Sequence, residues 1–236
     1  MPSEELHSQK RIHVLIGESS RIHCDLLSQA LKRDHRLHII GSALSSHEFL
    51  GIADKQMPDT VIVSANLDDD PRGGLATLRA FHEAHPRIPA VILLDSPKRE
   101  LVLEAFRAGA QGIFSNNASL EMLCKCVRVV HDGQIWASGN EIKFALEALS
   151  SAPMVRAVNA GGLNLLSHRE LQVVHYLAEG LSNGEIGARL GLSRHTIKNY
   201  LLKIYDKLGV SNRVELLFLS LSRPSTAMQE IAGMDV

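Results

Sequence analysis

Four side chains on one face of a predicted helix have the chemistry to read DNA bases. They follow the i, i+3, i+4, i+7 spacing of a single helix face, and they are His195, Lys198, Asn199 and Leu202. Lysine can donate to guanine O6 or N7, asparagine can bond adenine at two points, and leucine can touch a thymine methyl group. We therefore predict that this face contacts bases. The alternative is an amphipathic helical bundle that docks a protein partner.

Side chains that flank this face are predicted to contact DNA phosphates, and they are Arg194, Thr196, Lys203 and Arg213. The whole chain is almost neutral, with 25 Lys and Arg against 26 Asp and Glu. Residues 189–213, however, hold six basic side chains and a single acidic one, Asp206. Because positive charge is concentrated where a nucleic-acid surface requires it, double-stranded DNA is the expected partner.

The elements that position these side chains are helices throughout residues 163–222. Ser182 and Glu185 have the spacing of a capping box that opens a short helix, and Gly191 ends it. Ser193 then caps a third, basic helix that stops at Gly209. Two short helices joined by a tight turn, the second of them basic, are typical of a helix-turn-helix module.

The first half of the chain alternates short apolar runs with amphipathic segments. Apolar runs without polar alternation indicate strands that are buried on both faces of a parallel sheet. The runs lie at 14–16, 37–40, 61–63, 91–94 and 112–114, and the helical segments at 20–34, 45–56, 74–85, 97–108 and 118–132. Five such units predict a doubly wound α/β sheet whose functional crevice lies at the carboxyl ends of the strands.

The C-terminal motifs resemble the LuxR-type helix-turn-helix of the NarL/FixJ response-regulator family. The matching stretches are Leu166-Ser167-x-Arg169-Glu170, Leu177 to Ile186, Leu190 to Asn199, and Lys207 to Arg213, with Gly184 and Tyr200 as departures. The resemblance implies that the third helix enters the major groove and that the fourth helps two copies pair. Its apolar residues are then dimerisation candidates, namely Val214, Leu217, Phe218 and Leu221. A homodimer is expected because such proteins commonly read paired half-sites.

That family places a receiver domain before the DNA-binding module, and residues 11–132 resemble one. Arg107 to Gly112 is similar to the stretch that enters the fifth receiver strand, and Pro58 to Val63 is similar to the third strand. We expect two domains: a receiver-like, flavodoxin-like five-stranded parallel sheet at 11–133 and an all-α four-helix module at 163–222. A linker at 134–162, with a helix near 140–149, joins them, and tails at 1–10 and 223–236 flank them.

The receiver resemblance also places five functional positions, and most of them have lost their chemistry. Ser64 stands where the family has the phosphate-accepting aspartate, and Glu18 and Ser19 stand at the two magnesium-binding acids. Leu94 replaces the phosphate-sensing Ser or Thr, and Asn116 replaces the phosphate-pairing lysine. Magnesium favours an oxygen shell with carboxylates, and a serine without a base is a poor nucleophile. The sequence therefore predicts a pseudo-receiver and a phosphorylation-independent regulator.

Alternatives remain open for this crevice. It is either a platform for dimerisation or an unidentified protein effector, a sensor of a small ligand or metal, or a site modified through an atypical route. Asp68, Asp69 and Asp70 lie in a loop that could restore a cation site, although a solvated acidic loop is favoured. An enzyme that uses Ser64 is disfavoured because the serine has no nucleophile elbow, so we expect no enzymatic activity.

The remaining composition points to a cytoplasmic protein without a cofactor or bound metal. No apolar run approaches the ~20 residues that span a bilayer, so no membrane partner is expected. The three cysteines, Cys24, Cys124 and Cys126, cannot all pair with one another, and no second Cys/His pair completes a zinc site.

Overall fold

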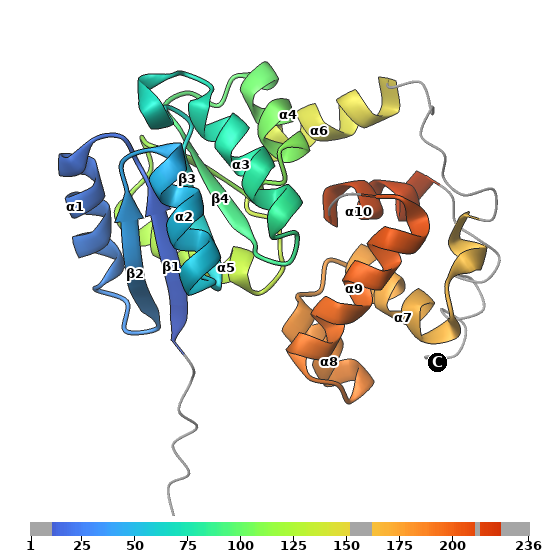
Figure 1. Ribbon diagram of the computed structural model, residues 1–236. Helices are drawn as coiled ribbons and strands as arrows, with labels where there is room; N and C mark the ends of the chain where they lie inside the picture. The colour runs from blue at the N-terminus through green and yellow to red at the C-terminus, as the bar shows by residue number, and fades with distance from the viewer. Residues whose placement is uncertain (1–10, 152–161, 211–212, 223–236) are drawn as a thin grey trace, which may run out of the picture.

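The computed structural model describes residues 11–151, 162–210 and 213–222. They form an α/β domain followed by a helical domain, which lie side by side in Figure 1. The two predicted tails and residues 152–161 of the predicted linker lie outside the described residues. The boundaries drawn between the domains from the sequence stay predictions.

The α/β domain is built on five parallel strands in the order β2-β1-β3-β4-β5. The strands are β1 (Ile12–Gly17), β2 (Leu37–Ala43), β3 (Thr60–Ser64), β4 (Ala90–Leu94) and β5 (Gly112–Ser115). The strand order reverses at β1, as in flavodoxin-like folds, and such a reversal opens a crevice at the carboxyl ends of the strands. The predicted fold class is confirmed.

Helices cover both faces of this sheet because its strands are apolar on both sides. The helices are α1 (Arg21–Leu31), α2 (Ser46–Gln56), α3 (Gly73–Ala84), α4 (Arg99–Arg107) and α5 (Leu120–His131), with a 3₁₀ turn, η1 (Leu67–Asp69). Phe49 of α2 and Phe81 of α3 belong to the core on one face. Leu31 of α1 and Val127 of α5 belong to the core on the other face. The predicted helix at 20–34 ends earlier, at Leu31.

The segment after α5 extends the α/β domain beyond the five strand-helix units. Trp136 makes an isolated parallel bridge with Gly112, in which its carbonyl accepts from the amide of Ile113 at 2.8 Å. Helix α6 (Gly139–Ser151) then packs on α4. An ion pair of 2.5 Å between Arg99 and Glu147 joins the two helices. The predicted helix near 140–149 is therefore present, and it packs against α4 of the receiver-like domain.

The helical domain begins with a 3₁₀ turn and continues with four α-helices. They are η2 (Gly162–Leu165), α7 (His168–Ala178), α8 (Asn183–Leu190), α9 (Arg194–Leu208) and α10 (Arg213–Ser222). Ser182 and Glu185 form the predicted capping box, in which each side chain bonds the other residue's amide. Gly191 (φ 66°) and Gly209 (φ 67°) end α8 and α9 in the left-handed conformation that glycine adopts without strain.

The helical domain has a hydrophobic core of its own, to which all four α-helices contribute. None of the helices in the described part of the chain is long and apolar enough to cross a membrane. The three cysteines are buried and unpaired, and burial raises the pKa of each thiol.

Candidate DNA-reading helix and altered receiver pocket

Helix α9 is held in place by a side-chain cap and by a close contact with α8. The Ser193 hydroxyl accepts from the amide of Thr196 at 3.1 Å. The amide of Leu192 donates to the carbonyl of Gly187 at 2.8 Å, and a Cβ at Gly187 would lie only 2.6 Å from the Leu192 carbonyl oxygen. The inner face of α9 is buried through Ile197, Leu201, Ile204 and Leu208. The opposite face is thereby turned away from the helical core.

The four predicted base-reading residues lie on this outer face, but the structure does not leave all of them exposed. His195 is exposed, whereas Lys198, Asn199 and Leu202 are half-buried. Lys198 and Leu202 line a small pocket of about 40 Å³ together with Arg87 of the α/β domain. The face predicted to contact bases is therefore partly covered in this arrangement, and its role in base contact stays a prediction. Helix periodicity does not report contacts between domains.

Polar contacts fasten the start of α9 to the end of α5. The Arg194 guanidinium pairs with the Asp132 carboxylate at 2.5 Å and donates to the His131 carbonyl at 2.6 Å. The amide of Asn183, the first residue of α8, donates to the Asp132 carbonyl at 3.0 Å. Gly133 (φ 83°) lies so close to Asn183 that a Cβ there would overlap its side chain. The helix-turn-helix is thus docked on the α/β domain through residues 131–133.

Two side chains at the docked interface have lowered pKa values. Burial, together with the charges of Arg194 and Lys198, lowers the pKa of His131 to about 3. Burial and the neighbouring Arg194 also lower the pKa of Lys198 to about 8. His131 is therefore neutral at neutral pH, and its Nδ1 lies 3.2 Å from the Thr60 hydroxyl. Lys198 keeps its charge at neutral pH in an environment that already contains a second cation.

The predicted phosphate-contacting residues divide into two groups. Lys203 is exposed and Thr196 is half-buried beside Ser193, so both stay predictions. The structure does not place Arg213 in its predicted phosphate-contacting position. Its side chain is 5% exposed and donates to Asn183 Oδ1 at 3.2 Å and to the Leu181 carbonyl at 2.7 Å. Arg213 therefore links α10 to α8 inside the fold and does not face the surface. Its charge can be read from the sequence, but the direction of its side chain cannot.

The predicted dimerisation residues on α10 are only partly described. Val214 is half-buried against the hydrophobic core of the α/β domain, and Leu217 packs against the core of the helical domain. The side chains of Phe218 and Leu221 lie outside the described residues. The role of this face in pairing two copies stays a prediction, and in this arrangement Val214 is occupied within one chain.

The receiver pocket comprises the polar residues at the carboxyl ends of the strands, and Ser64 lies at its floor. Ser64 ends β3 and is 3% exposed. The amide of Gly74 donates to the Ala65 carbonyl at 3.0 Å. A Cβ at Gly74 would overlap the carbonyl oxygen of Ser64, so only glycine fits here without movement. The loop at 67–74 is consequently folded tightly over the end of β3.

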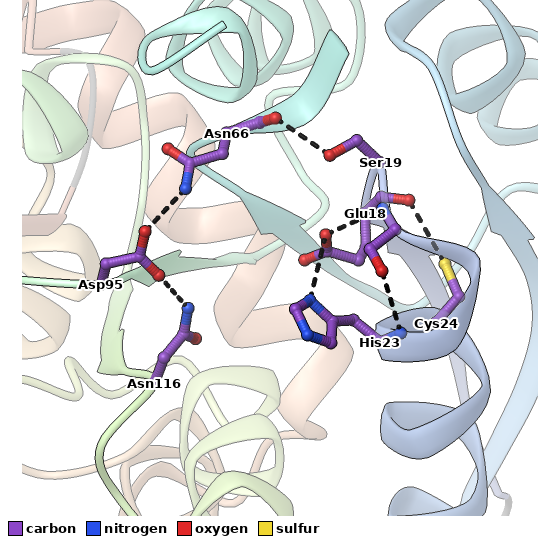
Figure 2. A network of polar contacts seen from close by, with 8 residues as sticks. Glu18, Ser19, His23, Cys24, Asn66, Asp95 and Asn116 are labelled. Atoms are coloured by element: carbon purple, nitrogen blue, oxygen red, sulfur yellow. Dashed lines mark hydrogen bonds and ion pairs between the residues drawn. The ribbon is translucent and has the colours of Figure 1, made fainter. Parts of the chain in front are cut away.

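Glu18 and Ser19 lie after β1, and each bonds a different neighbour (Figure 2). The buried Glu18 carboxylate accepts from the Ser20 amide at 3.1 Å and lies 3.8 Å from His23 Nδ1. The Ser19 hydroxyl donates to the Asn66 carbonyl at 3.2 Å. Glu18 is thus engaged with the start of α1, and Ser19 ties the end of β1 to the loop after β3.

Asp95 is the member of the pocket that the sequence reasoning missed. Its two carboxylate oxygens accept from Asn66 Nδ2 at 2.7 Å and from Asn116 Nδ2 at 2.6 Å. Figure 2 shows the carboxylate between the two amides. The bridge joins the loops that follow β3, β4 and β5. Leu94, one residue earlier, is fully buried in the core. The available signal was an acidic residue directly after a fully apolar strand.

The pocket does not fit the magnesium ion that a receiver normally holds. Across the described ranges, no group of three or more His, Cys, Asp or Glu side chains converges on one point. Asp68 Oδ1 accepts from the Ser46 amide at 2.9 Å, and Asp70 Oδ1 accepts from the Arg72 amide at 3.0 Å. These two aspartates satisfy backbone donors at the start of α2 and within their own loop. The structure therefore gives no support to a cation site rebuilt by the acidic loop.

Comparison with known proteins agrees with both halves of the fold. Residues 14–128 match the response regulator receiver domain, and residues 164–220 match the luxR family of bacterial regulatory proteins. The chain is 30% identical over 184 residues to the response regulator GacA of Pseudomonas viridiflava, which covers 78% of this chain and 83% of GacA. It is 29% identical over 212 residues to the probable transcriptional regulatory protein SgaR of Hyphomicrobium methylovorum, with 90% and 93% covered.

The chain therefore belongs to the LuxR-type response regulators, which are DNA-binding transcriptional regulators with a receiver domain. A solved structure of the response regulator RcsB in complex with DNA has the same two-domain fold. It is 20% identical, covers 89% of this chain and 98% of its own, and superposes with a TM-score of 0.53. At this identity the likeness establishes the fold alone.

Proposed function

We propose that this protein binds specific DNA sequences through α9 as a homodimer, without phosphorylation of its receiver domain. His195, Lys198, Asn199 and Leu202 are assigned to the bases. Arg194, Thr196 and Lys203 are assigned to the phosphates, and Arg213 is withdrawn. Phosphorylation independence is supported above all by the Asp95 carboxylate. Its oxygens accept hydrogen bonds from the side-chain amides of Asn66 at 2.7 Å and of Asn116 at 2.6 Å.

The charges around Ser64 disfavour a phosphoryl group at this position. A phosphoryl group carries between one and two negative charges near neutral pH and needs cationic or hydrogen-bonding partners. In this pocket the position of the phosphate-pairing lysine is Asn116, and its amide already donates to a carboxylate. An incoming phosphoryl group at Ser64 would meet the negative charge of Asp95 without a lysine or magnesium to offset it. The bridge ties together the loops that follow β3, β4 and β5.

The docking of α9 implies that DNA binding requires the two domains to separate. Arg194 is assigned to phosphate contact and is held by Asp132 at 2.5 Å. Because DNA and residues 131–133 compete for the start of α9, any factor that favours separation raises the DNA affinity. In place of phosphorylation, a higher protein concentration favours separation through dimerisation, and DNA favours it by binding α9.

The direct test combines DNA selection with chemical phosphorylation. Untreated protein is used to select sequences from a random DNA library, and we expect paired half-sites with centres about 10 base pairs, or a multiple of one turn, apart. A second portion is incubated with acetyl phosphate and magnesium and is examined by mass spectrometry. We expect no phosphoryl addition and no change in DNA affinity.

Ser64→Ala is the matched control, because it removes the only hydroxyl at the phosphoacceptor position of this chain. The variant should bind the selected DNA like the parent protein, with and without acetyl phosphate. Phosphoryl addition that tightens DNA binding in the parent and disappears in Ser64→Ala would refute phosphorylation independence. Failure to enrich any sequence would refute specific DNA binding.

A further inference from the structure

A cationic cleft of about 490 Å³ lies between the α/β domain and the start of α9. The α/β domain contributes Arg11, Arg36 and Arg128 to its walls, and α9 contributes Arg194 and Lys198. The volume is in the range of sites that hold small molecules. Because the cleft is formed by two domains, it exists only while α9 is docked.

The carboxylates around the cleft do not neutralise its cations. Asp34, behind the wall, pairs with both Arg36 and Arg128. Burial alone would raise the pKa of Asp34, but hydrogen bonds from the two arginines lower it overall. Its single negative charge therefore serves two guanidinium groups.

The other two carboxylates leave the same excess. Asp132 is engaged with Arg194 at 2.5 Å, and Asp59 Oδ2 accepts from the amide of His13 at 3.0 Å. Five cations thus face three carboxylates. Within the described residues, the side chains of Arg11 and Lys198 make no ion pair or hydrogen bond. Burial, followed by the charge of Arg194, lowers the pKa of Lys198 to about 8.

We propose that this cleft binds a small polyanion of the phosphate class, and that the bound anion holds α9 in the docked position. Guanidinium groups present paired donors that match phosphate oxygens, and lysine adds a point charge. The two histidines in the lining, His131 and His195, are its only aromatic rings. A stacked nucleobase therefore has little to pack against, and compact oligophosphates or sugar phosphates fit the lining better than nucleotides.

The bound anion acts on DNA binding through linkage. It contacts cations of both domains at once, so it binds the docked state and not the separated one. It also occupies Arg194 and Lys198, which are assigned to DNA under the proposed function. This second step rests on that function, whereas anion binding itself does not. The cleft would make the protein a sensor whose DNA affinity falls as the anion concentration rises.

The binding test uses pyrophosphate and the full-length protein in a buffer of constant ionic strength. Isothermal titration of the parent protein is compared with Arg11→Gln/Arg36→Gln, which removes two cleft cations outside the DNA-binding domain. The control is Lys32→Gln/Arg33→Gln, which removes the same charge from two exposed residues of the α/β domain that do not line the cleft. We expect about tenfold weaker binding or more in the first variant, a loss of at least one charge-assisted hydrogen bond, and little change in the control.

A second cleft variant tests the same site independently, so the result does not depend on the folding of the first variant. Lys198→Gln alters the opposite wall of the cleft and should also weaken pyrophosphate binding, while circular dichroism verifies that each variant is folded. Equal pyrophosphate affinity in the parent and both cleft variants would overturn the proposal, as would binding no tighter than that of the buffer anions. A stronger loss in the Lys32/Arg33 control than in the cleft variants would overturn it as well.

The effect on DNA is measured separately, with the selected DNA and increasing pyrophosphate at fixed ionic strength, because salt alone weakens DNA binding. The parent protein should lose affinity, and Arg11→Gln/Arg36→Gln should keep it. If both proteins lose affinity equally, the anion competes without the cleft and the regulatory inference fails. If neither binds DNA but the titration difference persists, the proposed function fails and the anion site stands.

Discussion

The DNA-reading helix and the receiver pocket differ in how their chemistry is assembled. The outer face of α9 takes its residues from one helix, within eight positions of the sequence. The receiver pocket takes Ser64 from the end of β3, and Glu18, Asp95 and Asn116 from the loops after three other strands. The helix matches the luxR family motif, whereas the pocket contains one of the expected acidic residues, Glu18, and the bridge made by Asp95. A surface on one element can be conserved as a unit, but a pocket of several loops can be altered one residue at a time.

The junction between the two regions combines residues of both domains. Arg194 and Lys198 belong to the helix by sequence, and in the docked structure both line a cleft with residues of the α/β domain. Asp132 and His131, which end α5, hold the start of that helix. The two regions are thus connected through the end of α5 and not through the receiver pocket itself, which lies at the opposite ends of the strands.

The largest expected effect concerns the helix. Asn199→Ala and Lys198→Ala should each weaken binding to the selected DNA by about 1–3 kcal/mol, or roughly 5–150-fold, because each removes a contact to a base edge. Fluorescence anisotropy with the selected and with mismatched DNA measures this. Lys203→Ala is the control: an exposed phosphate-contacting lysine should weaken binding to all sequences alike and reduce the salt slope by about one. Unchanged sequence preference in both helix variants would remove the base-reading assignment.

Much of this helix could be predicted from the sequence, because its signals are local. Ser193 as the cap, Gly209 as the stop and the apolar positions at Ile197 and Ile204 depend on neighbours within two turns. The direction of Arg213 was not predictable. Its partners, the Leu181 carbonyl and Asn183, lie about 30 residues away and become neighbours only after the domain has folded.

The positions of Ser64 and Asn116 in the pocket were predictable, but the bridge made by Asp95 was not. Ser64 and Asn116 could be placed because apolar strands fix the positions that follow them. The Asp95 bridge was not predicted because an exposed acidic residue after a strand usually faces solvent. Its meaning depends on two amides, Asn66 and Asn116, whose loops meet only at the edge of the assembled sheet.

A glycine substitution tests whether the pocket is as tightly closed as the structure describes. Gly74→Ala should destabilise the protein by about 1–3 kcal/mol in urea denaturation, because its Cβ would overlap the Ser64 carbonyl and overpacking strains the backbone. Gly51→Ala is the control. Gly51 lies inside α2 with open space around it, and alanine there should stabilise the helix by about 0.5–1 kcal/mol. Equal effects of both substitutions would show that the loop at 67–74 is not seated against β3.

The pH dependence of stability tests the junction through His131. Burial, Arg194 and Lys198 lower its pKa to about 3 in the folded protein, against 6.5 for the free side chain. The unfolded chain therefore binds a proton that the folded chain does not, and stability falls as the pH drops from 6.5 towards 3. The slope from this group is at most about 1.4 kcal/mol per pH unit.

Urea denaturation at about pH 7 and about pH 5 measures this loss of stability. His131→Gln should flatten the dependence, while His35→Gln, at an exposed position, should leave it in place. The same acid sensitivity in His131→Gln and in the parent protein would exclude His131 as its source.

The smallest expected effect is on DNA affinity when the ion pair that docks α9 is removed. It must be distinguished from the effect of removing any negative charge. Asp132→Asn removes the partner of Arg194, and both side chains are partly exposed, so the ion pair contributes only about 0.2–1 kcal/mol. The release of α9 should tighten DNA binding by up to about fivefold. Asp206→Asn removes the same charge from an exposed residue of α9 that does not line the cleft, and it raises the general attraction to DNA alone. Only the excess of Asp132→Asn over Asp206→Asn measures docking, and the absence of such an excess would mean that residues 131–133 do not restrain the helix in solution.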